Sequence, residues 1–279
     1  MRGRREYGKK HLVLVVLATC ALADAALLAK FVSDAAVVRA AVDVPDHLTP
    51  SQKVVALAQF LDTSVPKAAT LDRSFLPGLD FLRPTARQVL EHGGDCADRS
   101  RLLIVLLRNE GVYATKVALH DSQGSPQHAV VVASIEDEDH SMVIDALFGM
   151  YFPKPDGGYY SVWEIQRDET ILRERVKQLG ADDAFIRGYP LEQYSYAAPK
   201  SINWSKSHAM SLLYQVLHSI IGDRVDRLPR PAIVSEPVLV TLVGLVSVQA
   251  ALIMGVAWVA RRQRPGRRAS YVHAVANHG

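Results

Sequence analysis

The motif Gly-Gly-Asp-Cys at residues 93–96 places Cys96 directly before an apolar stretch, residues 101–108, that is long enough for a buried helix. The two glycines allow a tight turn, and Asp95 is suited to capping a helix that begins at Cys96. A thiol at a helix N-terminus lies at the positive end of the helix dipole, which stabilises the nucleophilic thiolate. The motif therefore predicts a nucleophilic cysteine, although a small buried side chain with no chemical role fits the local sequence equally well.

Two later residues could activate this thiol. His128 lies in residues 127–135 and Asp145 in residues 141–147, two apolar segments that are typical of strands. If the acidic residues 136–139 form the hairpin loop, residue 135 pairs with 140 and every opposed pair of residue numbers sums to 275. Residues that are opposed or two apart share a sheet face, so His128 and Asp145 become diagonal neighbours on one face. The carboxylate could then orient the imidazole, whose other ring nitrogen faces the thiol.

These elements resemble the core of the transglutaminase-like superfamily. The resemblance covers residues 84–150: Gly94, Asp95 and Cys96 opening an apolar helix, the segment Asn-Glu-Gly-Val-Tyr-Ala at 109–114, and the strands with His128 and Asp145. It implies a papain-like site on an α+β fold, with Cys96 as nucleophile, His128 as general base and acid, and Asp145 as orienting carboxylate. An aromatic residue often follows the histidine in this family, and here that residue is alanine. The resemblance does not carry over a substrate class.

Other chemistry has weaker support in the sequence. His120 and His140 are expected to be exposed loop histidines, because neither has a carboxylate strand at matching spacing. A serine triad from Ser100 or Ser125 lacks a Gly-x-Ser-x-Gly elbow. No cofactor is predicted, and no dedicated calcium loop is present. The paired Cys-x-x-Cys or His-x-x-x-His spacing of metal sites is missing from the one conceivable ligand set, which is Cys96, His120, His128 and His140.

Apolar residues are concentrated at the two ends of the chain. The 279 residues are 49% hydrophobic, with a mean hydropathy of +0.05. Residues 237–260 carry no charge, and at 1.5 Å per residue they can cross a hydrocarbon core of about 30 Å. Residues 11–33 are also apolar but are interrupted by Asp24 and Lys30. We predict a transmembrane anchor there. A cleaved signal peptide ending near residue 23 and a lipoprotein site at Cys20 are the alternatives.

Positive charge flanks both apolar segments. The tail 1–10 carries +4 and the tail 261–279 carries +5, which against a total of +3 leaves −6 for residues 11–260. The positive-inside rule then puts both tails in the cytoplasm and the chain between the spans outside it, in a periplasmic type of compartment. The expected partners are the lipid bilayer and a protein or peptide substrate in the cell envelope, and nothing indicates nucleic acid.

Between the spans we expect one extracytoplasmic domain, residues 40–228, and a proline-rich tether, residues 229–236. Thr49 and Pro50 begin one helix, residues 85–91 form a short helix before the cysteine turn, and residues 113–119 form a further strand. Residues 162–179 are predicted to be one amphipathic helix, and residues 210–221 an apolar helix that packs on the domain. Helices separated in sequence from an antiparallel sheet indicate an α+β fold. An aromatic stretch that packs on the domain or lines a cleft contains Tyr189, Tyr194, Tyr196 and Trp204.

The sequence leaves two kinds of function open. The first is a membrane-anchored cysteine enzyme that cleaves or transfers the acyl group of an amide through a Cys96 thioester, with water or an amine as acceptor. The second is a catalytically silent scaffold or binding module of an envelope or polysaccharide assembly. A small-molecule acyltransferase is a third possibility, but its acyl thioester donors are cytoplasmic. Nothing in the sequence indicates the substrate or the oligomeric state.

Overall fold

The computed structural model describes residues 2–67, 75, 82–121, 125–135, 141–194, 196, 199–202, 204, 208–228, 230–231 and 235–262. The chain divides into two units. One unit is Lys30–Val238, and the other combines Met1–Ala29 with Leu239–Gly279. Each unit is described by itself below.

The larger unit is built on one antiparallel sheet of four strands, β1 (Ala114–His120), β2 (Pro126–Ser134), β3 (Ser141–Asp145) and β4 (Met150–Tyr151), in that spatial order. The predicted α+β class is confirmed. The strand expected at residues 113–119 is present as β1, shifted by one residue. The two-residue strand β4 was not predicted, because Met150 and Tyr151 are too few to give an alternating pattern.

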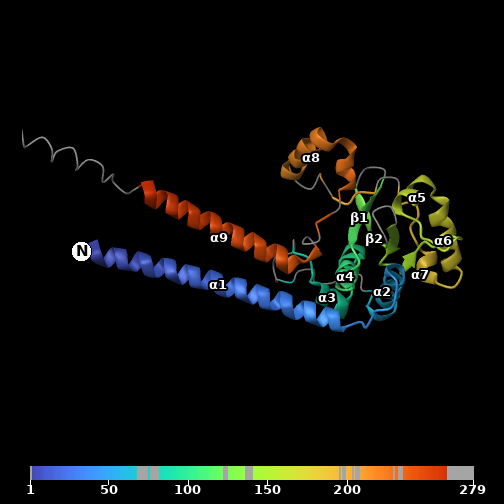
Figure 1. Ribbon diagram of the computed structural model, residues 1–279, viewed down its shortest axis with the longest axis horizontal. Helices are drawn as coiled ribbons and strands as arrows, with labels where there is room; N and C mark the ends of the chain where they lie inside the picture. Colours follow the sequence, from blue (N-terminus) through green and yellow to red (C-terminus); the bar gives the residue numbers. More distant parts are fainter. Residues whose placement is uncertain are drawn as a thin grey trace, which may run out of the picture. The chain divides into compact units, whose positions relative to one another are not determined.

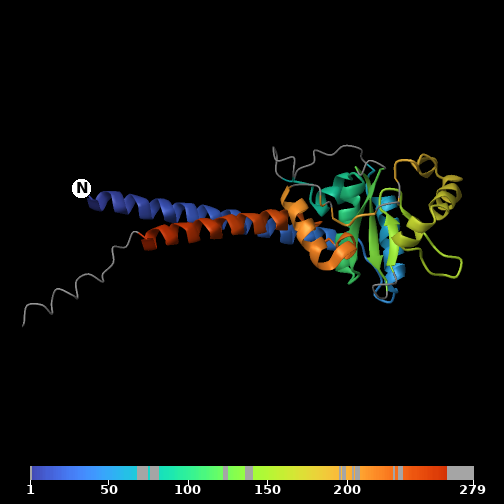
Figure 2. The same cartoon turned by 90° about the horizontal axis from the view of Figure 1, so that it is seen from above.

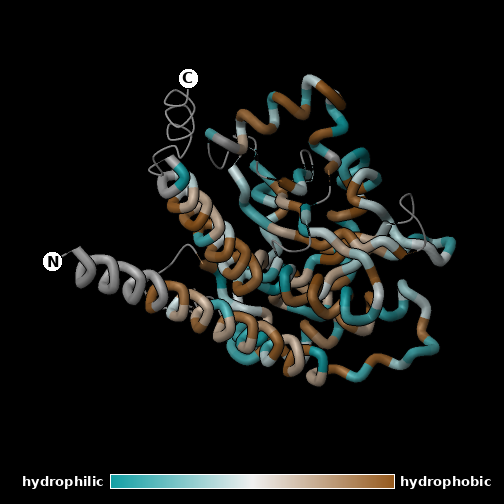
Figure 3. Tube along the Cα trace, turned by 60° about the vertical axis from the view of Figure 1, so that its left-hand side comes forward, coloured by the Kyte–Doolittle hydropathy of each residue, from teal (hydrophilic) through white to brown (hydrophobic). Residues whose placement is uncertain are grey.

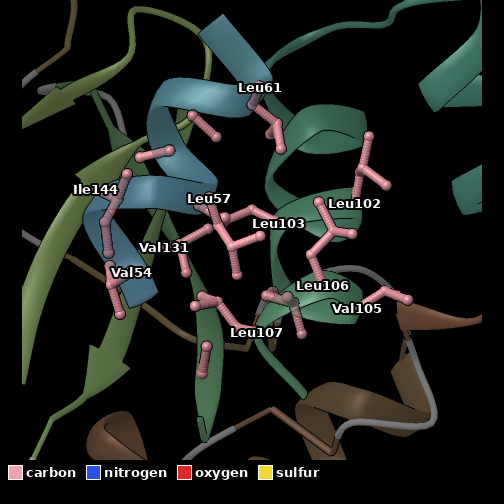
Figure 4. Close-up of a cluster of buried hydrophobic side chains, with 14 of the residues drawn as sticks. Val54, Leu57, Leu61, Leu102, Leu103, Val105, Leu106, Leu107, Val131 and Ile144 are labelled. Carbon is pink, nitrogen blue, oxygen red and sulfur yellow. The ribbon is translucent and has the colours of Figure 1, made fainter. Parts of the chain in front are cut away.

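Helices cover both faces of this sheet (Figures 1 and 2). One face packs against α2 (Pro50–Ser64), α3 (Ala86–His92) and α4 (Cys96–Asn109), and α4 lies along β1 and β2. The other face packs against α5 (Val162–Arg167), α6 (Thr170–Gly180) and α7 (Ala184–Arg187). Figure 4 shows the first core, in which aliphatic side chains of α2 and α4 meet Val131 of β2 and Ile144 of β3. This burial of apolar area is the main force that holds α4 on the sheet.

Capping residues begin three of these helices, and two of them, Thr49 and Asp95, were predicted to do so. Thr49 and Thr85 each form a capping box with the glutamine three residues later, and the Asp95 side chain accepts a hydrogen bond from the backbone N–H of Asp98. Each of the two glycines before Asp95 is required for a different structural reason. Gly93 has a φ of 79°, which disfavours other residues. A Cβ on Gly94 would lie 2.7 Å from Cβ of Asp98, so only glycine allows this close approach.

The predicted register of the β2–β3 hairpin is confirmed. Val131 pairs with Ile144, and the next three pairs end at Ser134 with Ser141, so every pair sums to 275. By alternation, His128 and Asp145 both belong to the face that α5, α6 and α7 cover, as Val130 and Val143 do. The predicted loop 136–139 and His140 lie outside the described residues.

One helix prediction is wrong, and a second is right about the position of the helix but wrong about its packing. The expected single helix 162–179 is broken into α5 and α6 at Asp168, whose backbone is extended (φ −137°, ψ 92°). The Asp168 carboxylate accepts hydrogen bonds from both the N–H and the hydroxyl of Thr170, which compete with helix continuation. The helix expected at 210–221 is present as α8 (His208–Ile221) but does not pack its apolar side chains on the domain. The exposed side chains are Leu212, Leu213, Val216 and Ile220.

After α8 comes a 3-10 helix, η2 (Gly222–Arg227), and then the segment predicted to be a tether. Its described residues are fastened to the domain rather than extended away from it. The backbone N–H of Arg230 donates to Thr115 Oγ1 at 3.2 Å, and Arg108 Nη2 donates to Glu236 Oε1 at 2.5 Å. Ser235 and Glu236 are buried.

The smaller unit contains parts of two long apolar helices (Figure 3), α1 (Arg2–Ala40) and α9 (Pro237–Arg262). Within them, Val15–Ala40 and Pro237–Trp258 are long and apolar enough to cross a membrane, with mean hydropathies of 2.0 and 2.2 and almost no burial. Asp24 is the acidic residue that interrupts the first apolar stretch. Its Oδ1 accepts a hydrogen bond from Gln249 Nε2 of α9 at 3.3 Å.

Candidate active site

Cys96 is the first residue of α4. Its helix is capped by Asp95, and the thiol is half-buried and not in a disulfide. The first N–H groups of a helix have no partner within the helix and point toward its N-terminus, where they favour negative charge. Cys96 therefore lies where the sequence motif predicts, at an electropositive helix end that solvent can reach.

His128 and Asp145 form a buried pair. Nε2 of His128 lies 2.6 Å from Oδ2 of Asp145, and both side chains have no exposed area. The other carboxylate oxygen accepts the backbone N–H groups of Leu147 and Phe148 at 3.1 and 3.2 Å. With three hydrogen bonds, Asp145 is held in one orientation and holds the imidazole in turn. The structure thus brings together the two residues that the register predicted to be neighbours.

The same imidazole interacts with Cys96. Because Nε2 is bound by Asp145, the ring nitrogen left for the thiol is Nδ1, which is buried and has no nitrogen or oxygen partner among the described residues. Burial is the largest single influence on His128 and lowers its pKa. The charge and hydrogen bond of Asp145, followed by those of Cys96, outweigh burial and raise this pKa to about 10. The imidazole is therefore protonated at neutral pH, between two groups that are negative when ionised.

Aromatic rings surround this imidazole. Tyr194 stacks on it with ring centroids 4.1 Å apart and an angle of 7° between the planes. Phe148 and Tyr189 contact it edge-on at 6.1 and 6.2 Å. The sequence placed Tyr194 only in an aromatic stretch and gave no sign that it covers His128. An aromatic face next to an imidazolium is an attractive cation–π arrangement, which favours the protonated ring.

Two residues of α4 hold the helix against the sheet: Arg99, which the sequence analysis did not single out, and Ser100, which it considered only as a triad serine. The fully buried Arg99 donates to four backbone carbonyls, at Leu61 (2.6 Å), Val65, Pro66 and Ala146. Ala146 follows Asp145, so Arg99 links the cysteine helix directly to the backbone next to the carboxylate. Ser100 Oγ donates to the carbonyl of Ala129, the residue after His128. The available signal was a basic residue one turn after Cys96, ahead of the apolar part of the helix.

The remaining sequence candidates have other surroundings or other roles. His120 is 6% exposed at the end of β1, so the expectation of an exposed loop histidine is wrong for it. His120 is buried, and the β1–β2 pairing shifts register between Leu119 and His120. Ser100 is used to hold β2, and the backbone N–H of Ser125 binds Asp121. No group of three or more potential ligands is placed to hold a metal ion within the described part of the chain. A separate pocket of about 300 Å³ is lined by residues that include Phe152, Tyr160 and Arg175, and by no member of the Cys96 site.

The raised pKa of His128 predicts a pH-dependent stability. A group whose pKa is higher in the folded state contributes stability that is fully present below its ordinary value of 6.5 and is lost as pH rises through about 10. We therefore expect the full chain in detergent to unfold at a lower denaturant concentration above pH 10 than below pH 6.5. In His128→Gln this part of the pH dependence should disappear. An unfolding midpoint with the same pH dependence in both proteins would contradict the assignment.

The Cys96 thiol, the His128 imidazole and the Asp145 carboxylate thus lie in contact, in the order that acyl transfer through a thioester would require. The backbone amides at the start of α4 add donors beside the thiol. Comparisons of the chain with protein-family models, with curated proteins and with solved structures found no match. The chemistry of the site is therefore argued from its residues and their geometry.

Proposed function

We propose that this protein is a membrane-anchored cysteine enzyme with a transglutaminase-like site, which cleaves or transfers the acyl group of an amide bond. The observation that carries the proposal is the contact of one buried imidazole with both Asp145 and Cys96 at the start of α4. A cysteine with no chemical role needs no buried, protonated histidine beside it. Strongly perturbed ionisable groups of this kind gather at functional sites.

The proposed reaction has two steps. The Cys96 thiolate attacks the amide carbonyl carbon and forms the C–S bond, while the C–N bond breaks and the His128 imidazolium gives its Nδ1 proton to the leaving amine. Water or a second amine then gives a proton back to Nδ1 and attacks the thioester, which releases the acyl group and restores the thiolate. The Asp145 carboxylate accepts the hydrogen bond from Nε2 throughout and takes up no proton. The two steps leave the enzyme unchanged and consume one acceptor for each bond cleaved.

Negative charge develops on the carbonyl oxygen during both steps. We assign its stabilisation to the backbone N–H groups at the first turn of α4, beginning with that of Cys96 itself. The N–H of Asp98 already donates to Asp95, so the available donors are the N–H groups of Cys96 and Ala97, and the helix dipole adds to their effect. A donor in such a position typically contributes about 10²–10³-fold to the rate.

The apolar helices α1 and α9 are proposed to be the membrane anchors, with the basic tails in the cytoplasm and the Cys96 domain outside it. The hydrogen bond between Asp24 and Gln249 supports an uncleaved N-terminal anchor, because it gives each polar side chain a partner within an otherwise apolar environment. A signal peptide cleaved before residue 24 would remove the first half of α1 and leave α9 as the single span. The proposed substrates are amide-bearing proteins or peptides of the cell envelope.

The reactivity of Cys96 tests the enzyme proposal without knowledge of the substrate. The full chain in detergent, carrying Cys20→Ser so that one thiol remains, is treated with iodoacetamide at pH 6.5 and the modified peptide is quantified by mass spectrometry. The thiolate is the form of cysteine that iodoacetamide alkylates, and a neighbouring imidazolium stabilises a thiolate. We expect alkylation at least about tenfold faster than that of N-acetylcysteine, and a rate near that of the free thiol in His128→Ala.

A catalytically silent binding module is the second candidate, and one observation favours it. His128 has no exposed side-chain area and is covered by the stacked ring of Tyr194, so the acid–base group is closed to solvent. In a silent module Cys96 would react no faster than a free thiol in the folded chain, and His128→Ala would not slow it. That result would remove the enzyme proposal and leave the anchored module.

A further inference from the structure

We propose that a cationic cluster beside Cys96 binds an anionic oxygen group of the substrate, a carboxylate or a phosphate, close to the bond that is cleaved. The cluster consists of Arg83, Arg101, Lys116 and Arg230. This inference rests on the proposed function and deepens it, because it assigns a negative charge to the substrate of the Cys96 site.

Two of the four cations are held at the start of the cysteine helix. Arg83 Nη1 lies 3.1 Å from Asp95 Oδ2 and 3.6 Å from Asp98 Oδ1. Arg101 Nη2 lies 2.6 Å from the same Asp98 oxygen. Because Asp95 directly precedes Cys96, these ion pairs fix both guanidinium groups at the end of α4 that carries the thiol.

The other two cations come from the neighbouring sheet edge. Lys116 lies in β1 opposite Val131, on the face that α4 covers, and it interacts electrostatically with Cys96, Arg83, Arg101 and Arg230. Arg230 is fixed by its backbone hydrogen bond to Thr115, the residue before Lys116. Burial is the main cause that lowers the pKa of Lys116, to about 8, and the three arginines lower it further. The four positive charges therefore repel one another.

The described carboxylates do not balance this cluster. Asp95 and Asp98 are shared by Arg83 and Arg101, whereas no ion pair within 4.0 Å joins Lys116 or Arg230 to a carboxylate in the part of the chain that the structure describes. Nε of Arg101 is also buried without a hydrogen-bond partner there, although the residue is only 6% exposed. Buried donors of this kind are normally hydrogen-bonded. The unpaired N–H at Nε of Arg101 therefore points to an acceptor outside the described part of the chain.

An oxyanion fits these requirements together. Arginine forks bind carboxylate and phosphate oxygens with paired N–H donors, and a negative group would offset the repulsion that lowers the Lys116 pKa. Partial burial strengthens the attraction relative to that at an open surface. Lys116 interacts with Cys96 itself, and Arg83 is paired with Asp95, the residue before it. The bound group would therefore belong to a molecule whose carbonyl is within reach of the thiol.

The test compares two alkylating agents that differ mainly in one charge. Iodoacetate carries a carboxylate and iodoacetamide is neutral, and both modify the remaining thiol of the Cys20→Ser full chain in detergent. We expect the ratio of the iodoacetate rate to the iodoacetamide rate to be about tenfold higher for Cys96 than for N-acetylcysteine, and to fall as salt is added. Lys116→Met should lower this ratio severalfold, and Lys116→Arg should restore it. The matched control is Lys177→Met, which removes an exposed charge of α6 and should leave the ratio unchanged.

The outcomes separate this inference from the proposed function. Fast reaction with iodoacetamide but a ratio like that of the free thiol, unchanged in Lys116→Met, would overturn the anion site and leave the enzyme proposal intact. Slow reaction with both reagents would overturn both. Protection of Cys96 against iodoacetamide by sodium propionate assigns a carboxylate, and protection by inorganic phosphate assigns a phosphate. Protection by neither anion would count against the site.

Discussion

Replacing Cys96 with serine should lower the rate at which the full chain hydrolyses an activated ester, p-nitrophenyl acetate, by at least about 10³-fold. Serine keeps the size of the side chain but replaces a thiol that ionises readily with a hydroxyl that does not. The imidazolium next to it would then have no thiolate to stabilise, and no thioester could form. The measurement is the release of p-nitrophenolate, together with the mass of the acylated protein after rapid acid quenching. Wild-type protein should carry one acetyl group on the peptide that contains Cys96.

The chain offers its own control for this substitution. Cys20 is the second free cysteine and lies in α1, in the other unit, so Cys20→Ser should keep the wild-type rate and acylation. Because Cys96 is half-buried and makes no disulfide, Cys96→Ser should retain the unfolding midpoint of the wild type. Hydrolysis that survives in a folded Cys96→Ser protein would exclude the thioester mechanism.

Features of this site that depend on neighbours in sequence were predictable. Thr49, Thr85 and Asp95 cap their helices because a short polar side chain can reach the third N–H that follows it. The hairpin register followed from an acidic loop between two apolar segments, and it was enough to place His128 and Asp145 on one face. The register of a single hairpin was therefore enough to predict that two of the three site residues are neighbours.

Features that depend on contacts between distant segments were not predictable. Tyr194 stacks on His128 from 66 positions further along the chain, and no pattern near either residue requires it. From its neighbours in sequence, Arg99 looks like an ordinary polar residue. Its role depends on the carbonyls of α2 and of Ala146, which accept its hydrogen bonds in the folded chain. His120 is buried at the end of β1, where the pairing with β2 shifts register, and neither feature is visible in its neighbouring residues. The apolar pattern of α8 predicts an amphipathic helix, but it does not say what the apolar face contacts.

The cation cluster illustrates the same division. Arg83, Arg101, Lys116 and Arg230 are spread over almost 150 positions and share no motif. They gather because α4 packs on β1 and because Arg230 returns to Thr115. The cysteine motif predicted where a reaction could occur. The identity of what the site binds depends on residues that only the tertiary structure brings to it.

Asp145→Asn should reduce ester hydrolysis and iodoacetamide labelling of Cys96 while leaving the fold intact. The asparagine oxygen can still accept the N–H groups of Leu147 and Phe148, but its amide would present N–H donors to Nε2 in place of a carboxylate oxygen. The imidazole would lose the negative charge that chiefly raises its pKa. In the neutral ring, Nδ1 would carry the proton. It would then face the thiol as a hydrogen-bond donor and could not accept the proton of the thiol. In a serine protease the corresponding substitution costs about 10⁴-fold, and we expect a loss of roughly 10²–10⁴-fold here.

A second aspartate–histidine pair of the chain serves as the control. Asp223 lies 3.3 Å from His218 on the exposed surface around α8 and η2, so Asp223→Asn removes a similar contact where solvent screens it, and the rate should stay that of the wild type. Because the lost negative charge acts through His128, labelling of Cys96 in Asp145→Asn should also become more strongly dependent on pH, with the rate rising toward the range in which a free thiol ionises. An Asp145→Asn protein with a wild-type rate and pH profile would show that the carboxylate neither orients the imidazole nor keeps it charged, and that Cys96 and His128 act without it.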